Sequence, residues 1–404
     1  MNKVRIGYYL AGVEGGVSTG GVWPYAVRLL ESLLASPIPV DFHLLITSAQ
    51  HEYVQEFCQR WPNRQITFSE IRFSRIMNFF YYLLGNLIFT FGLRRLIKYV
   101  RKINYLEWQM RGHKIDIVHS PVQTLPTFAW QKPLIITMHD VQELHLPEFF
   151  SPRERAIRAQ IHWWCLESAT KIVVSFDHIK EDLIRYFQIS PEKICVCPLP
   201  IQRTWLPDCD EAIAKNIRAK YHLHDSFLLY PAQTWKHKNH LGLLKALIHL
   251  RDIDGLTPQL ICTGKMNSFY ESIEQVIRQY NLQSQVQFLG IVPSDELAAL
   301  YKQCYCVVVP TLYEAGSFPV IEAMMLGAPV ICSQTTSLPE TIGDLRFTFD
   351  ANRPIDIARS LRQVLTDEQF RMQNIENGTQ RIQVMLDNPG KVAESVQKMY
   401  ETLA

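Results

Sequence analysis

The residues whose types and spacing could do chemistry are concentrated in one stretch, Pro310–Cys332, which reads PTLYEAGSFPVIEAMMLGAPVIC. Two acids, Glu314 and Glu322, lie on either side of a small loop and the start of a predicted helix, Pro319–Leu326. Proline suits the start of a helix because its missing N–H would be unpaired there anyway. The free N–H groups of a first helical turn bind anions. We therefore interpret the stretch as a nucleotide-sugar site, with a phosphate at the helix start and the two acids on hydroxyl groups.

A short basic loop supplies cations for the same site. It reads TWKHKNH, includes Lys236 and Lys238, and follows a predicted buried strand, Ser226–Ala232. In a doubly wound domain a phosphate is expected at the carboxyl end of the first strand. Lys238, with Lys236, could neutralise a diphosphate leaving group without a metal ion. The alternative is a solvated charged loop with no ligand.

The first half of the chain offers a histidine and a pair of glycines. His139 ends a predicted buried strand, Pro133–Met138, and could bind or polarise a transferred sugar near its reacting carbon. The alternative is a core histidine whose hydrogen bonds are satisfied within the protein. Gly20 and Gly21 follow the first predicted strand, at a place where backbone could approach a ligand closely.

These residues need strands to position them, and strands alternate with helices along the whole chain. Such alternation is typical of parallel sheets covered by helices on both faces. A chain of 404 residues exceeds one ordinary core. We predict an α/β fold of two doubly wound, Rossmann-like domains that face each other across a cleft. The predicted domains are residues 1–198 and 199–385, and a final helical segment, 386–404, could cross back to the first domain.

Composition limits the partners and the compartment. The net charge of +2 gives no general reason to expect nucleic acid binding. Nine cysteines without a CxxC pair argue against zinc or disulfides and favour a reducing cytoplasm. The N-terminus, MNKVRIGYYLAG, enters a strand directly, so no signal peptide is expected. No cluster of residues with metal-ligand spacing is evident, so we predict no metal site.

One segment, residues 72–114, departs from this composition and is termed the basic insertion. It holds nine Lys or Arg against one acid, Glu107, a local charge of +8 that leaves −6 for the rest of the chain. Within it, 76–93 runs for 18 residues without a charge, slightly short of the roughly 20 apolar residues of a spanning helix. Three interpretations stay open. The segment packs on its own domain, or forms a peripheral surface for an anionic membrane or a lipid-linked acceptor, or spans the membrane.

At this level of detail the chain resembles a known family. The ordered pieces GGVSTGG, ITMHD, KIVVSFDHIKEDL, YPAQTWKHKNH, YEAGSFPVIEAMMLGAPVICS and SLPE resemble glycosyltransferase family 4 over nearly the whole chain. The resemblance implies the GT-B fold and a retaining transfer, without metal, of a hexose of mannose or glucose type. It implies a UDP- or GDP-sugar donor and a saccharide or lipid-linked acceptor. The acceptor hydroxyl would attack from the face that the diphosphate leaves.

The resemblance also implies roles for individual residues on the donor side. Glu322 would bind the ribose hydroxyls, and Glu314 would face the donor sugar. The backbone around Ser317 and Phe318 would line the phosphate and sugar, and Lys238 would hold the diphosphate.

On the other side of the donor, the resemblance makes His139 the sugar-side histidine and makes Gly20 and Gly21 the loop that closes on the phosphates. The chain departs from the family at two places. Gln233 stands where many members have an arginine, and the usual Glu-Gly-Phe-Gly reads Glu-Ala-Gly-Ser from Glu314. These departures keep open a non-catalytic nucleotide-binding partner subunit. A second alternative is a nucleotide-sugar epimerase on the same fold.

Overall fold

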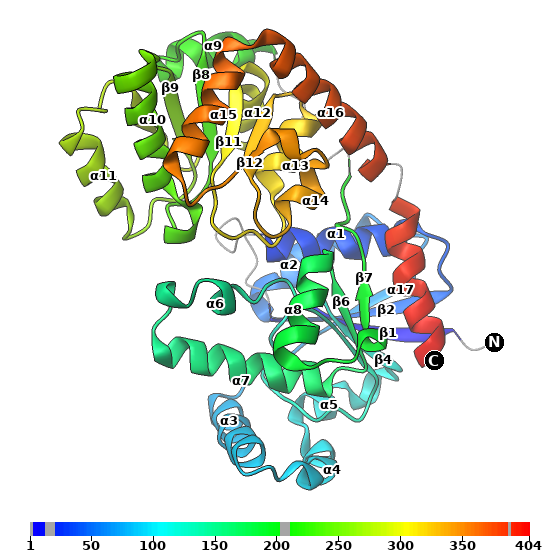
Figure 1. The fold of residues 1–404 in the computed structure, drawn as a ribbon. Coiled ribbons are helices and arrows are strands. Elements are labelled where there is room, and N and C mark those ends of the chain that lie inside the picture. The colour runs from blue at the N-terminus through cyan, green and yellow to red at the C-terminus, as the bar shows by residue number, and fades with distance from the viewer. Residues whose placement is uncertain (1–2, 13–20, 203–210, 387–388) are drawn as a thin grey trace. The chain divides into compact units, whose positions relative to one another are not determined.

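The computed structural model describes residues 3–12, 21–202, 211–386 and 389–404. The chain divides into two compact units, the first formed by Met1–Pro200 with Asn388–Ala404 and the second by Ile201–Asp387. Each unit holds one parallel sheet with helices on both of its faces (Figure 1). The predicted α/β fold of two doubly wound domains is confirmed.

The sheet of unit 1 has seven strands in the order β3-β2-β1-β4-β5-β6-β7, and all its pairs are parallel. The strands are β1 Val4–Tyr9, β2 Val40–Ile46, β3 Ile66–Glu70, β4 Ile117–Ser120, β5 Leu134–Thr137, β6 Lys171–Val174 and β7 Ile194–Val196. The chain winds one way from β1 to β3 and the other way from β4 to β7. The reversal between β1 and β4 makes the carboxyl ends of these strands the expected ligand-binding edge.

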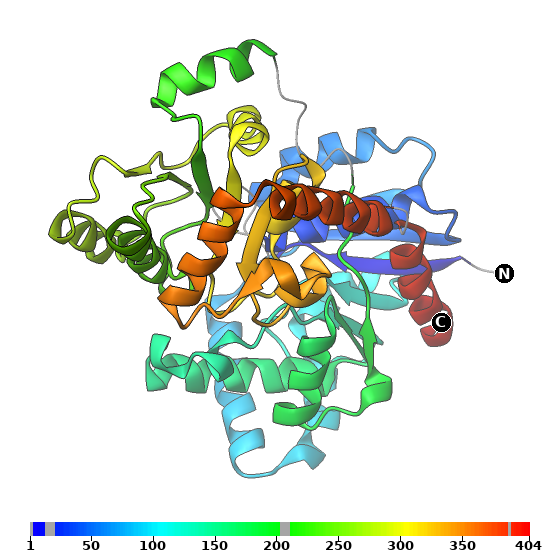
Figure 2. The same cartoon turned by 45° about the horizontal axis from the view of Figure 1, so that its top comes forward.

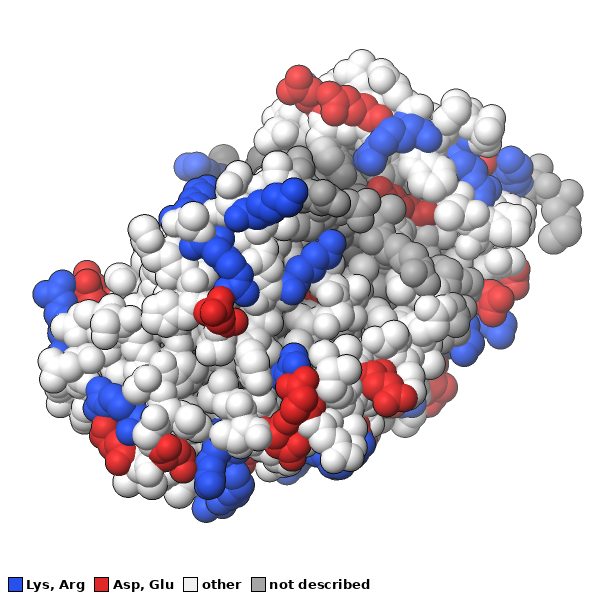
Figure 3. Space-filling view, turned by 90° about the horizontal axis from the view of Figure 1, so that it is seen from above, with Lys and Arg blue, Asp and Glu red and all other residues white. Residues whose placement is uncertain are grey.

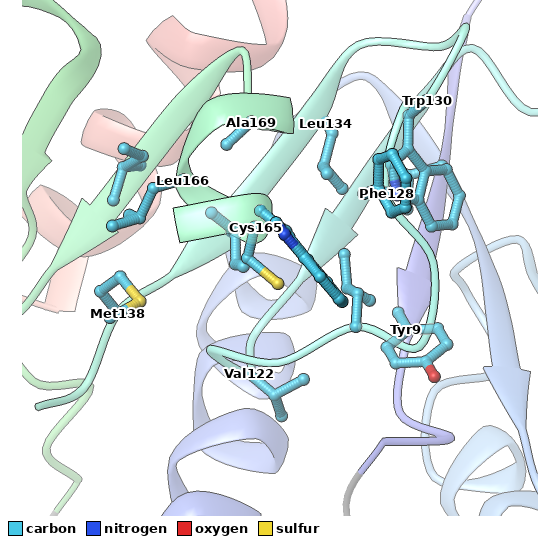
Figure 4. Close-up of a cluster of buried hydrophobic side chains, with 14 of the residues drawn as sticks. Tyr9, Val122, Phe128, Trp130, Leu134, Met138, Cys165, Leu166 and Ala169 are labelled. Carbon is cyan, nitrogen blue, oxygen red and sulfur yellow. The ribbon is translucent and has the colours of Figure 1, made fainter. Parts of the chain in front are cut away.

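The helices of unit 1 cover both faces of this sheet. They are α1 Val22–Ala35, α2 His51–Gln59, α3 Arg75–Thr90, α4 Ile97–Val100, α5 Tyr105–Met110, α6 Gln142–His145, α7 Pro152–Ser168, α8 Asp177–Phe187 and α17 Pro389–Leu403. On one face, Cys165 and Leu166 of α7 lie in a buried cluster with Leu134, Phe128 and Trp130 (Figure 4). Burying these side chains holds α7 against β5 and the segment that precedes it.

The C-terminal helix α17 belongs to unit 1. It packs against α1 (Figures 1 and 2), and its Val396 and Tyr400 are buried in the core on that face of the sheet. The hydroxyl of Tyr400 lies 2.7 Å from Nδ1 of His119, which stands on β4 and is completely buried. Burial lowers the pKa of His119 to about 3, so this histidine is a neutral core residue.

The sheet of unit 2 has six parallel strands in the order β10-β9-β8-β11-β12-β13. The strands are β8 Phe227–Pro231, β9 Gln259–Thr263, β10 Val286–Phe288, β11 Cys306–Val309, β12 Val330–Ser333 and β13 Thr348–Phe349. The helices are α9 Glu211–Tyr221, α10 His240–Asp254, α11 Tyr270–Gln279, α12 Ser294–Gln303, α13 Phe318–Met325, α14 Leu338–Ile342, α15 Pro354–Thr366 and α16 Glu368–Leu386. Here the winding reverses between β8 and β11, so the loops after these two strands form the expected ligand-binding edge.

The basic insertion folds into α3, α4 and α5 with short 3-10 turns between them. Its long helix, α3, has 16 residues. Among the helices that the structure describes, none combines the length and apolar character needed to cross a bilayer.

Candidate functional site

The reversal point of the unit 2 sheet carries an ion pair. Lys238 lies in the 3-10 turn Lys236–Lys238 after β8, and Glu314 lies in the loop after β11. The Nζ atom of Lys238 is 2.7 Å from Oε2 of Glu314. The side chains of Lys238 and Glu314 keep only 19% and 11% of their exposure. A largely desolvated cation therefore stands where a phosphate is expected.

Hydrogen bonds between the two loops hold this pair in place. The carbonyl of His237 accepts from the N–H of Leu312 at 2.7 Å and from the hydroxyl of Thr311 at 3.0 Å. The side-chain amide of Asn239 donates to the carbonyl of Pro310 at 3.0 Å, while its oxygen caps α10 by accepting from the N–H of Gly242. Asn239 has φ of 57°, a left-handed conformation that asparagine tolerates better than most residues. The two loops thus form one rigid support.

A third loop, after β12, clamps the backbone of Glu314. The N–H of Glu314 donates to the hydroxyl of Thr336 at 2.9 Å, and this hydroxyl donates back to the Glu314 carbonyl at 2.6 Å. The hydroxyl of Ser337 donates to the same carbonyl at 2.9 Å. Sequence reasoning missed Thr336 and gave no role to Ser337, which begins the SLPE piece. Their position just beyond a buried parallel strand, at the same edge, is the signal that could have found them.

Helix α13 begins beside this support with an unpartnered hydroxyl. It starts at Phe318, one residue before the predicted start, with Pro319 in its first turn. Ser317 is the N-cap and is fully buried, but its side chain makes no capping hydrogen bond. Its hydroxyl is a buried polar atom without a hydrogen-bond partner in the described structure. Such a group is costly to bury unless something pairs with it, so it marks a place where a ligand group would be stabilised.

The second acid of the motif is held by a tyrosine. The hydroxyl of Tyr301, on α12, donates to Oε2 of Glu322 at 2.6 Å. Burial raises the pKa of Glu322, and the hydrogen bond from Tyr301 partly opposes this. Tyr301 is itself fully buried. It fixes the carboxylate of Glu322 in one orientation, and nothing in its sequence context indicated this partnership.

Lys236 and Gln233 make contacts with other residues. Lys236 is exposed, and its Nζ lies 5.8 Å from the ring centroid of Phe269. Gln233, which stands where many family members have arginine, accepts a hydrogen bond from the indole N–H of the exposed Trp235 at 3.0 Å. The structure therefore brings one of the two predicted lysines, Lys238, to Glu314.

In unit 1, His139 lies just beyond β5 with its ring engaged. Its Nε2 donates to the carbonyl of Pro121 at 2.8 Å, and the ring meets Tyr25 edge to face at a centroid distance of 4.8 Å. The backbone N–H of His139 donates to the side-chain oxygen of Gln123 at 3.0 Å. Burial lowers the pKa of His139. The ring is thus neutral at pH 7 and carries its proton on Nε2.

A charged network follows His139 directly. Arg158 on α7 lies 2.9 Å from Glu143 and 3.2 Å from Asp140, and Nδ1 of His162 lies 3.1 Å from the other oxygen of Glu143. Burial by itself would raise the pKa of Glu143, but hydrogen bonding and charge from His162, with the charge of Arg158, lower it to about 2. Sequence reasoning missed this network because its members are spread over two helices and a loop.

The remaining predicted site residues are the two glycines. Gly20 lies outside the described residues. Gly21 caps α1 with φ of −75°, a conformation open to any residue, so its backbone does not itself require glycine. Within the described residues, no group of three or more His, Cys, Asp or Glu could hold a metal ion. The metal-independent reaction stays a prediction.

Two doubly wound domains, the second with a charged group at its reversal point, are the arrangement of the GT-B fold. The chain matches two family models, "Glycosyltransferase Family 4" over residues 19–205 and "Glycosyl transferases group 1" over residues 214–381. It belongs to glycosyltransferase family 4, and the predicted family is confirmed.

Individual relatives narrow the comparison. The chain is 29% identical over 266 residues to O-antigen chain mannosyltransferase B of Escherichia coli, covering 65% of this chain and 69% of the relative. It is 25% identical over 336 residues to O-antigen chain mannosyltransferase RfbU of Salmonella typhimurium, covering 81% and 82%. Among solved structures, Alr3699/HepE of Anabaena in complex with UDP and glucose matches with a TM-score of 0.67 at 16% identity, covering 99% of both chains. This last likeness concerns the fold alone.

Proposed function

We propose that this glycosyltransferase moves a hexose of mannose or glucose type from a nucleotide-diphosphate sugar to a saccharide or lipid-linked acceptor, with retention of anomeric configuration. The observation that carries the proposal is the Lys238–Glu314 pair at the reversal point of the unit 2 sheet, beside the unpartnered hydroxyl of Ser317. A cation, a helix start and an unpaired donor together suit a diphosphate and the sugar attached to it.

The donor would be held by groups already in place. Lys238 would exchange its contact with Glu314 for the diphosphate, which carries more charge than a single carboxylate. Glu314 would then accept hydrogen bonds from sugar hydroxyls, and Glu322, fixed by Tyr301, would accept them from the ribose. The backbone around Ser317 and Phe318 would face the phosphates at the start of α13. For His139 and for the Gly20 and Gly21 loop, the family resemblance is the support.

The proposed reaction breaks the bond between the anomeric carbon and the diphosphate oxygen. The acceptor oxygen forms its bond to that carbon on the same face, and the acceptor proton passes to the leaving phosphate oxygen. No protein carboxylate acts as nucleophile in this scheme. Stabilisation of the leaving group by Lys238 and the α13 N-terminus would supply most of the catalysis.

The relatives guide the choice of donor. Two of them are named as mannosyltransferases of O-antigen chains, and HepE was solved with UDP and glucose. We therefore propose GDP- and UDP-hexoses as first candidates, and a growing saccharide, free or lipid-linked, as acceptor.

A thermal-shift screen against UDP-, GDP- and ADP-sugars tests the proposal, since a ligand that binds only the folded state raises the melting temperature. Product analysis with the stabilising donor then separates the candidate functions. A transferase releases nucleotide slowly without acceptor, an epimerase interconverts two sugars, and a non-catalytic subunit does neither. Conversion of one nucleotide sugar into another, without release of nucleotide, contradicts the proposal.

Glu322→Ala tests the ribose contact. We expect donor and free nucleotide alike to bind at least about tenfold more weakly, since charge-assisted hydrogen bonds contribute about 1.5–3 kcal/mol each. Tyr301→Phe keeps the carboxylate but frees its orientation, so it should weaken binding less. Titration of both variants with the nucleoside diphosphate measures this. Unchanged affinity of the Ala variant would remove Glu322 from the site.

A further inference from the structure

Helix α3 in the basic insertion has two apolar faces, and one of them packs on unit 1. Tyr81, Gly85 and Ile88 are buried, and a Cβ added at Gly85 would collide with the indole ring of Trp164 on α7. The hydroxyl of Tyr81 donates to the carbonyl of Ile103 at 2.6 Å. The helix is therefore docked firmly on its own domain, as the first of the three interpretations expects.

The opposite face of α3 is apolar and exposed. Side chains on it keep between 43% and 81% of their exposure: Ile76, Phe79, Phe80, Leu83, Leu87 and Phe91. At 3.6 residues per turn these positions fall within an arc of about 120°. Large apolar side chains gathered on one exposed face mark an interaction site more often than chance.

Cations flank this helix in the sequence. Those described as exposed in the insertion are Arg72, Arg75, Arg95, Lys98, Arg101, Lys102, Arg111 and Lys114. The insertion has one acid, Glu107, which is buried and accepts from the backbone N–H groups of Gln131 and Lys132. Elsewhere, on the face drawn in Figure 3, acidic and basic side chains are interspersed. The insertion thus combines exposed charges of one sign with an exposed apolar helix face.

We propose that this face, termed the α3 surface, docks on the headgroup region of an anionic lipid bilayer, with α3 lying in the plane of the membrane. A helix with an apolar face and a basic margin binds this way, its apolar side chains entering the boundary between headgroups and acyl chains. A second copy of the chain fits less well because it would bring a second charge of +8 against the first. Packing and peripheral docking are compatible here, because they use opposite faces of one helix.

Vesicle flotation tests the apolar centre, using the full chain and phosphatidylcholine vesicles with or without phosphatidylglycerol. We expect binding to the anionic vesicles that falls as salt is added. Phe79→Glu with Leu87→Glu should weaken it at least about tenfold, because each charge opposes insertion. The matched control is Ile253→Glu with Leu345→Glu, which places the same charges at side chains that are 72% and 65% exposed in unit 2. This control should bind like the wild type.

Substitutions of the basic residues of the insertion give an independent test of the proposal. Lys98→Ala and Arg101→Ala should each weaken binding to anionic vesicles by about fivefold without affecting the melting temperature. Absence of wild-type binding overturns the proposal, as does equal binding of the wild type and the Phe79/Leu87 variant when both are folded. Sedimentation that shows a wild-type dimer converted to a monomer by the Phe79/Leu87 change would assign the α3 surface to a second copy instead.

Discussion

The carboxyl edges of the two sheets both carry an ion pair, but they use it differently. In unit 1, Glu143 has no exposed side-chain surface and meets two partners, the guanidinium of Arg158 and the ring of His162. In unit 2, Glu314 meets Lys238 alone, and both side chains keep some exposure. The first arrangement joins one helix to the next. The second joins two loops at the reversal point of the sheet.

The difference teaches which charges are available to a ligand. A buried carboxylate that already meets two partners is not available to pair with a ligand. Removing one of those partners would leave a buried charge uncompensated. A single lysine that is partly exposed can exchange one anion for another. We therefore expect changes in the unit 1 network to alter stability and changes at Lys238 to alter turnover.

The largest expected effect is at Lys238. Lys238→Ala should lower turnover by a factor of about 10²–10³, the range for losing one preorganised electrostatic stabiliser of a leaving group. Lys236→Ala is the matched control, two positions away on the same 3-10 turn but exposed, and it should stay within a few-fold of the wild type. Steady-state turnover with the donor found by thermal shift measures both. Near-normal turnover of the Lys238 variant, or equal losses of turnover in the two variants, would contradict the claim that Lys238 is the charge available to the donor.

Glu143→Gln tests the enclosed pair of unit 1 through pH. The pKa of Glu143 is lowered from 4.5 to about 2 in the folded chain, so its charge stabilises the fold above the unfolded pKa. That stability is lost as the pH falls through the folded value. At pH 7 the wild type should have a free energy of unfolding greater by roughly 3 kcal/mol. The gap should narrow below about pH 4.5 and close near pH 2.

Denaturant unfolding across this pH range measures the gap. Glu148→Gln is the control, since Glu148 is exposed in the loop that follows α6, and it should match the wild type at every pH. A gap that stays constant with pH would mean that the glutamine packs poorly rather than that the charge is lost.

Much of the fold could be predicted because its signals are local. Buried strands and the helices between them show in the periodicity of short segments, and β5 and β8 lie within the predicted strands, Pro133–Met138 and Ser226–Ala232. The Lys238 and Glu314 neighbourhood could be anticipated because residues that follow adjacent parallel strands share one sheet edge.

The rest depends on contacts between distant segments. Tyr301 comes 21 positions before Glu322, and Thr336 comes 22 positions after Glu314. Neither shows a pattern of its own, because a single hydroxyl on a helix or in a loop is common everywhere. The two faces of α3 were also out of reach, since an apolar run does not say which of its sides is covered. Side-chain packing decided these points, and one sequence carries little information about it.

The smallest expected effect is that of Ser317→Ala, which tests whether the carboxyl edge of the unit 2 sheet holds an unpaired group for the donor. The hydroxyl of Ser317 is buried without a partner, so Ser317→Ala removes a desolvated group and should leave the free energy of unfolding unchanged or slightly raised. If the hydroxyl pairs with the donor, the same change weakens donor binding by about fivefold, the equivalent of one hydrogen bond of roughly 1 kcal/mol. Ser337→Ala is the matched control, because its equally buried hydroxyl already donates to Glu314 and its loss should lower stability. Chemical unfolding and donor titration of both variants separate the two roles. A Ser317 variant that loses stability yet binds donor normally would show that its hydroxyl serves the fold, and that unit 2 keeps no unpaired group for the ligand.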